Sequence, residues 1–342
     1  MEVVLYKPSS KKPQPSASES GGSGLVLPEG DNLRRCAHCH KPEVVGLKLK
    51  SCSSCRNILY CSGECQKANW PTHKNTCRAG PPAQEHQLAQ YGYTSAAAFS
   101  RDVRDYIDAH SWAIRNIVMI IRQIWRDTHP NTPIREQPRR IRFRLQCQTS
   151  PSNPRKNHNP ATRFAVVGTP ALCDLDEWIR DFPDWWEQSE RGRAELETKY
   201  AREQGPDYLG LLSLEYFVPE TNACTMDFLP ILQPNVIDPD PDLRRLLFSD
   251  MICFSLRSMN CGFPLRMSAE SRQVGIPGHF VRVEKTWQWK PLFSSWDEYA
   301  LGEGKGPKDA AYRELDLAIS SRVFFHGPMP ELMKMQAWYC TM

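Results

Sequence analysis

The residues of this chain best suited to chemistry are cysteines crowded into one short stretch. Seven of the 13 cysteines lie between positions 36 and 77. With one histidine they make four pairs of potential metal ligands, each pair separated by two or three residues: Cys36 and Cys39, Cys52 and Cys55, Cys61 and Cys65, His73 and Cys77. Thiolates with an imidazole favour zinc, and a site with four protein ligands is closed and tetrahedral, with sulfurs about 3.8 Å apart. Eight ligands therefore predict two structural Zn²⁺ ions per chain, in consecutive or interleaved sites, since the spacing allows both.

The other six cysteines point to a reducing compartment. They are scattered singly through the remaining sequence, whereas a secreted disulfide scaffold would distribute paired cysteines through its fold. The first residues carry an early acid, Glu2, and no apolar run typical of a secretory signal. The run from Ile117 to Ile121 is far shorter than the roughly 18 residues of a membrane helix. We therefore expect an intracellular protein of the cytoplasm, the nucleus or both, without a membrane segment.

The order of the ligands resembles that of one family of small zinc domains. Histidine is the seventh of the eight ligands, whereas RING fingers usually place it fourth and PHD fingers fifth. The stretch resembles the MYND zinc finger, in which a Tyr precedes the fifth ligand, a Gln follows the sixth and a Trp comes four residues later. These three positions are Tyr60, Gln66 and Trp70 here. The resemblance is limited to residues 36–77, and the twelve-residue gap between the second and third ligands implies a longer loop than is usual.

The resemblance implies how the ligands divide and what the finger binds. In MYND fingers the pairs interleave, so that Cys36, Cys39, Cys61 and Cys65 bind one zinc and Cys52, Cys55, His73 and Cys77 bind the other. MYND fingers typically bind proline-containing peptides of the Pro-x-Leu-x-Pro type, with the Gln and the Trp in contact with the peptide. Gln66 and Trp70 are therefore the expected peptide-binding residues. The chain also contains such a motif itself, from Pro230 to Pro234, which could bind a MYND surface or simply end a strand.

The charge distribution does not favour nucleic acid as a partner. Residues 1–80 carry a formal charge of +6. Seven thiolates and two Zn²⁺ ions reduce this excess to about +3, which is weak for a nucleic-acid footprint.

The finger segment is short and has few apolar side chains, so it cannot build a core of its own. The metals must therefore stabilise it.

The rest of the chain predicts a disordered tail over residues 1–30, a linker over 78–98 and an α+β domain with a mostly antiparallel sheet over 99–342. The tail is rich in Ser, Pro and Gly. Apolar residues at three- and four-residue steps predict one amphipathic helix from about 99 to 129. The alternation after it predicts a strand over 140–147 with Arg140, Arg142 and Arg144 on a solvated face. The remaining expected elements are strands at 163–168, 207–218, 224–232 and 280–289 and helices at 184–203 and 241–259.

No catalytic pattern is evident in the α+β region. Some MYND fingers lie within SET-domain lysine methyltransferases, but the nearest echo of their Asn-His-x-Cys motif is Asn157-His158-Asn159-Pro160, and Glu314-Leu315-Asp316 only hints at their second motif. A zinc with four protein ligands also has no open position for a substrate. We therefore expect a protein-interaction adaptor and not an enzyme. The alternatives are a transcriptional or chromatin cofactor, or a factor associated with ubiquitin ligases, acting through the same finger. The sequence does not indicate an oligomeric state.

Overall fold

The computed structural model describes residues 34–299, apart from short gaps, and four isolated residues after them, Leu315, Met329, Leu332 and Met333. The gaps are 45, 56–57, 75–76, 78–84, 134–135, 149–158, 174–175, 177–178, 181–182, 233–240, 268–273, 285 and 297–298. The tail expected over residues 1–30 lies outside the described residues. No helix of the described part is both long and apolar enough to cross a membrane.

The long helix expected over 99–129 is wrong, because the structure has two helices. Helix α3 spans Ala96–Ala109 and helix α4 spans Ser111–Thr128. His110 separates them with a non-helical backbone (φ −104°, ψ 16°). Its ring is fully buried, and Nε2 donates a hydrogen bond of 2.9 Å to the Ala161 carbonyl. A one-residue break fixed by a distant carbonyl leaves the apolar periodicity almost unchanged, so the sequence pattern cannot reveal it.

The main sheet is mixed and not purely antiparallel. Its strand order is β4-β3-β6-β7, and β5 also pairs with β3. The pairing of β3 with β6 is parallel, with Ile141 opposite Leu214, and the other pairings are antiparallel. The strands are β3 (Arg140–Cys147), β4 (Phe164–Val166), β5 (Ala171–Cys173), β6 (Tyr208–Val218) and β7 (Ala223–Leu232). A parallel pair needs a long crossover, and the chain between β3 and β6 supplies it with helix α6 (Pro183–Gln204).

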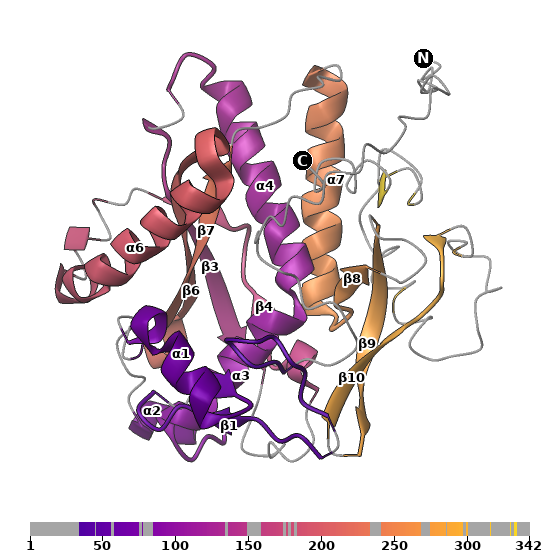
Figure 1. Cartoon of the computed structure of the whole chain (residues 1–342). Coiled ribbons are helices and arrows are strands. Elements are labelled where there is room, and N and C mark those ends of the chain that lie inside the picture. Colours follow the sequence, from indigo (N-terminus) through magenta and orange to yellow (C-terminus); the bar gives the residue numbers. More distant parts are fainter. Residues whose placement is uncertain are drawn as a thin grey trace, which may run out of the picture.

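A second, smaller sheet has the order β10-β9-β8 (Figure 1). Its strands are β8 (Leu265–Met267), β9 (Gly275–Val283) and β10 (Thr286–Pro291), all antiparallel. The single strand expected over 280–289 is therefore a hairpin. The turn contains Glu284 at a positive φ of 46°. Because the turn contains neither Gly nor Asn, the sequence gives no turn signal there.

Helices cover both faces of the main sheet. In Figure 1 the sheet stands between α6 on one side and the adjacent pair α4 and α7 (Pro241–Asn260) on the other. The inward-facing side chains of β3, such as Ile141, Phe143 and Leu145, are buried in one apolar cluster with α3, α4 and α7. Short 3-10 turns occur at Pro160–Thr162, Gly205–Asp207 and Pro219–Thr221.

The expectation that the basic face of β3 is solvated is wrong at the first residue of the strand. Arg140 is only 1% exposed. Its Nη2 lies 2.7 Å from Glu215 Oε2 on β6, and Arg142 Nε approaches the same oxygen at 2.7 Å. Periodicity shows which side chains share a face, but it does not show that a neighbouring strand places a carboxylate there.

The finger lies against the helices of the larger domain. Its elements are β1 (Lys50–Ser51), β2 (Leu59–Tyr60) and α1 (Gly63–His73), and α1 contacts α6. Arg34 Nη2, just before the first cysteine, lies 2.7 Å from Asp105 Oδ2 on α3. Within the segment expected to be a linker, helix α2 (Glu85–Ala89) and the following turn place Leu88 and Tyr93 in the large apolar core. The domain core therefore begins before residue 99.

Candidate metal centre

A hairpin, two turns and one helix position the ligands. Strands β1 and β2 pair with Lys50 opposite Tyr60, which places the turns holding the third to fifth ligands next to each other. The first two cysteines lie in a tight turn, in which the amide of His40 donates to the Cys36 carbonyl at 2.9 Å. The sixth and seventh ligands, Cys65 and His73, lie on α1. The finger thus depends on short local elements and contains no extended sheet or long helix.

Ser62 determines where α1 begins. Its side chain accepts a hydrogen bond of 3.2 Å from the amide of Cys65, as expected of an N-cap residue. Although proline usually breaks a helix, α1 continues through Pro71 to His73, with the proline in its last turn. The amide of Lys74 still donates to the Trp70 carbonyl at 2.8 Å. The continued helix is what brings His73 to the second site.

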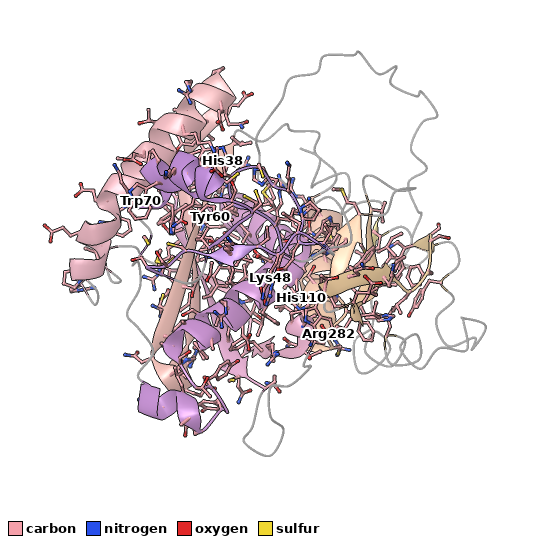
Figure 2. The ribbon with its side chains drawn as sticks, turned by 60° about the horizontal axis from the view of Figure 1, so that its bottom comes forward. His38, Lys48, Tyr60, Trp70, His110 and Arg282 are labelled. Atoms are coloured by element: carbon pink, nitrogen blue, oxygen red, sulfur yellow. The ribbon has the colours of Figure 1, made fainter. Side chains whose placement is uncertain are left out.

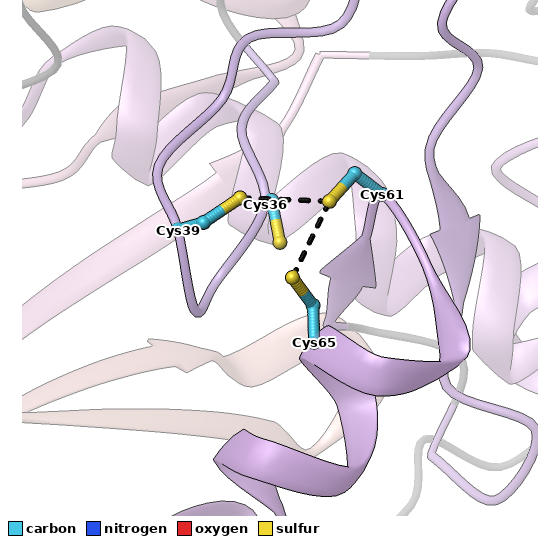
Figure 3. Close-up of side chains that lie close together, drawn as sticks. All are labelled: Cys36, Cys39, Cys61 and Cys65. Atoms are coloured by element: carbon cyan, nitrogen blue, oxygen red, sulfur yellow. Dashed lines mark hydrogen bonds between the residues drawn. The ribbon is translucent and has the colours of Figure 1, made fainter.

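The first site gathers the four cysteines of the first and third ligand pairs (Figure 3). The sulfurs of Cys36, Cys39, Cys61 and Cys65 all lie within 4.8 Å of one another. Cys61 Sγ lies 3.5 Å from Cys39 Sγ and 3.4 Å from Cys65 Sγ. These separations are close to the roughly 3.8 Å expected between thiolates on one tetrahedral zinc.

The second site gathers three cysteines and the histidine. Cys52, Cys55, His73 and Cys77 have their ligand atoms within 4.8 Å of one another. Cys52 Sγ lies 3.8 Å from Cys77 Sγ, and Cys55 Sγ lies 3.5 Å from His73 Nε2. The grouping is the interleaved one that the family resemblance implies. The consecutive arrangement, which spacing alone leaves open, does not form, because the first pair of ligands meets the third pair and not the second.

The donor sets fit two structural zinc ions. Soft sulfur ligands with one imidazole, arranged in two closed groups of four, match the tetrahedral preference of zinc and leave no position for water or substrate. Four of the ligands are buried, namely Cys36, Cys52, His73 and Cys77. The Gln66 side-chain amide points its Nε2 at Cys52 Sγ, 3.8 Å away, where it can donate to a zinc-bound thiolate.

Tyr60, and not Trp70, fills the small apolar centre of the finger. Tyr60 is 1% exposed and its ring meets the His73 ring edge-to-face at 6.2 Å. Asn69 Nδ2 donates to the Tyr60 hydroxyl at 3.0 Å. Asn69 was not singled out from the sequence, although its position on the same helix as Cys65 was a signal that it could reach the finger's interior.

Trp70 remains on the surface. Its side chain is 42% exposed, and its ring meets the His73 ring edge-to-face at 5.9 Å. Figure 2 shows Trp70 on the side of the finger that borders α6. Gln66 lies one turn earlier on the same helix and is half-buried. The structure thus places the two expected peptide-binding residues on one face of α1, with the indole exposed and the amide directed inward.

The internal Pro-x-Leu-x-Pro motif begins inside the main sheet. Pro230 pairs with Leu211 and Leu232 with Tyr208 at the end of β7, while residues 233 and 234 lie outside the described part. Ile231, between them, is 1% exposed. Use of this motif by a MYND surface would require the end of β7 to leave β6.

These features define a small cross-braced domain that two structural zinc ions hold together. Residues 36–77 match the family model of the MYND finger, and the chain therefore carries a MYND finger.

Known proteins similar to this chain match it over a short stretch only. The chain is 42% identical over 55 residues to the SET domain and MYND-type zinc finger protein 6 of Schizosaccharomyces pombe, covering 16% of this chain and 11% of that protein. It is 32% identical over 81 residues to Egl nine homolog 1 of Homo sapiens (24% and 18%). It is 39% identical over 51 residues to the MYND-type zinc finger protein samB of Aspergillus clavatus (14% and 8%). The chain thus spans less than a fifth of the length of these relatives. No solved structure is significantly similar to it.

Proposed function

We propose that this protein is an adaptor whose MYND finger binds proline-containing peptides of the Pro-x-Leu-x-Pro type. The observation that carries the proposal is the exposure of the Trp70 side chain, at 42%, whereas Tyr60, the other aromatic residue of the finger, is buried. A tryptophan exposed on a rigid helix contributes little to folding, and it offers a flat surface on which proline rings pack. The zinc ligands on either side of it, Cys65 and His73, hold that surface rigid, which lowers the entropic cost of binding.

Gln66 has a second role in the proposed complex. Its Nε2 points toward Cys52 Sγ, so its carbonyl oxygen is the free end of the amide. An extended peptide exposes backbone N–H groups, and such an oxygen accepts hydrogen bonds from them. The amide would then connect the bound peptide to the second zinc site.

An enzymatic function is not part of the proposal. Several similar proteins are named for a SET domain, but their similarity is confined to the finger. The closed coordination of both zinc ions argues for a structural role of the metals. The two alternative roles, a transcriptional or chromatin cofactor and a ubiquitin-ligase-associated factor, use the same binding activity. The identity of the bound protein would distinguish them.

A fluorescence-polarisation titration tests the proposal. A labelled Pro-x-Leu-x-Pro peptide should bind the zinc-loaded full chain, and a peptide with alanine in place of both prolines should not. Trp70→Ala should weaken binding at least about tenfold, equivalent to roughly 1.4 kcal/mol, while retaining two zinc ions. Trp125→Ala is the matched control, because Trp125 stacks on His129 at the far end of α4. Equal binding by the wild type and Trp70→Ala would contradict the proposal.

A further inference from the structure

A cluster of arginines lies where the C-terminal part of α4 meets the N-terminal part of α7. The two helices run side by side, with these ends at the top of Figure 1. Arg122 and Arg126 are one turn apart on α4 and therefore share a face. Arg244 on α7 lies with its Nη2 2.9 Å from Asp127 Oδ1, and its charge acts on Arg126. The cluster belongs to the α+β domain and includes none of the zinc ligands.

Asp127, the acid beside this cluster, already has two partners. Asp127 Oδ1 accepts from Gln123 Nε2 at 2.8 Å in addition to its ion pair with Arg244. Arg126 Nη1 donates to the neutral amide oxygen of Gln123 at 3.2 Å. Arg122 makes no hydrogen bond or ion pair with any residue that the structure describes. The guanidinium groups of Arg122 and Arg126 thus share one helix face, and the neighbouring carboxylate, that of Asp127, forms its ion pair with Arg244.

This arrangement places positive charges close together on the surface of α4. Burial and, second, repulsion by Arg126 lower the pKa of Arg122 to about 10. Burial likewise lowers the pKa of Arg126. The charge of Asp127 opposes this shift, and the charge of Arg244 adds to it. Partly buried cations are normally paired with an acid, because an unpaired one loses hydration without compensation. Guanidinium groups that share one helix face are suited to binding an oxyanion, to which each can donate two parallel hydrogen bonds.

We propose that Arg122 and Arg126 form a binding site for a phosphate-type oxyanion, with the Arg244–Asp127 pair as the neighbouring wall. The anion neutralises the repulsion between the two α4 arginines and accepts from the donors that no described residue satisfies. The same chemistry would bind free phosphate or a phosphorylated side chain of a partner. The site is independent of the finger, so it would give the adaptor a second point of contact.

Thermal unfolding of the zinc-loaded full chain tests the site. Inorganic phosphate should raise the melting temperature of the α+β domain by about 2–4 °C over sodium chloride at equal ionic strength, as a ligand specific to the folded state does. Arg122→Gln should abolish that shift and should melt higher than the wild type in chloride, because it removes the repulsion. Arg122→Lys, which keeps the charge but loses the two-pronged contact, should lose most of the shift. Arg202→Gln is the control, since Arg202 is exposed on α6, and it should retain the whole shift.

Two outcomes would overturn the proposal. One is a phosphate shift of zero in the wild type, or a shift that Arg122→Gln retains. The other concerns the acids Asp238, Asp240 and Asp242, which precede Arg244 in the sequence. A shift that appears only when all three are replaced by asparagine would mean that the chain's own acids fill the site.

A phosphoserine peptide and its unphosphorylated form then separate the two sources of the anion. Binding of the phosphorylated form alone identifies a side chain as the ligand, whereas equal shifts by free phosphate identify the ion.

Discussion

The finger and the α+β domain reach stability by opposite routes. The described residues of the domain form one cluster of 42 buried hydrophobic residues, drawn mainly from the strands and from α3, α4 and α7. The corresponding cluster of the finger contains five, and three of them are the zinc ligands Cys36, Cys52 and Cys77. The metal ions therefore replace an apolar core in the finger, while in the domain the burial of side chains is sufficient. The difference also explains why the finger can leave Trp70 exposed, because its stability does not depend on burying that side chain.

Removal of zinc should produce the largest difference between the finger and the α+β domain. Structural zinc contributes about 10–16 kcal/mol in finger peptides, so chelation with EDTA should unfold the finger alone. Hydrogen exchange should then show complete loss of protection in residues 36–77, with the amides of β3 and β6 still protected. Mass spectrometry under native conditions should show two zinc ions before chelation. If the whole chain unfolded with the finger, the two regions would be one cooperative unit and the comparison would be wrong.

Disruption of the buried ion pair should affect the domain and spare the finger. Glu215→Gln leaves Arg140 buried without its carboxylate, and removing one member of a buried pair typically costs about 3–5 kcal/mol. Urea unfolding should show the loss in the domain transition, with zinc content unchanged. The matched control is Glu195→Gln on the exposed surface of α6, which should change stability by less than about 0.5 kcal/mol. A small effect of Glu215→Gln would mean that water reaches Arg140.

Acid should weaken the domain through His110. Burial is the main cause that lowers the pKa of His110 to about 4 from an ordinary value near 6.5. The folded state therefore holds the neutral ring, and its stabilising contribution is complete above pH 6.5 and is lost as the pH falls toward 4. The full loss is about 3 kcal/mol.

The effect can be separated from acid release of zinc by comparing variants at the same pH. His110→Gln keeps a donor for the Ala161 carbonyl and does not titrate, so its domain stability should fall less between pH 6.5 and 4. His129→Gln, at the exposed end of α4, should follow the wild type. Parallel pH profiles for all three proteins would show that His110 is not responsible.

The smallest expected effect concerns the contact between the two regions. Arg34 is a partly exposed residue whose guanidinium pairs with Asp105 at 2.7 Å, and pairs of this kind contribute about 0–1 kcal/mol. Arg34→Ala should therefore change the domain stability by less than about 1 kcal/mol. It should increase hydrogen exchange in α1 if the pair fixes the finger against α3. Unchanged exchange would mean that the contact of α1 with α6 is sufficient.

The comparison also separates what was predictable from what was not. In the finger, ligand type and order predicted the metal and its number, because coordination geometry tolerates few spacings. Elements with strong periodicity, such as β6 and α7, were predicted to within one or two residues. The break at His110, the hairpin at Glu284 and the parallel pairing of β3 with β6 were missed, because each depends on a contact with a residue distant in the sequence.

The sequence by itself determined the zinc chemistry, the boundaries of the finger and the α+β character of the rest, since each follows from local spacing and side-chain type. Tertiary structure decided that the ligand pairs interleave, that Arg140 is buried against Glu215 and that Trp70 is exposed. It also decided which arginines meet between α4 and α7. The physical reason is the same in each case: coordination preferences and periodicity act over a few residues, whereas burial and charge pairing depend on segments that only folding brings together.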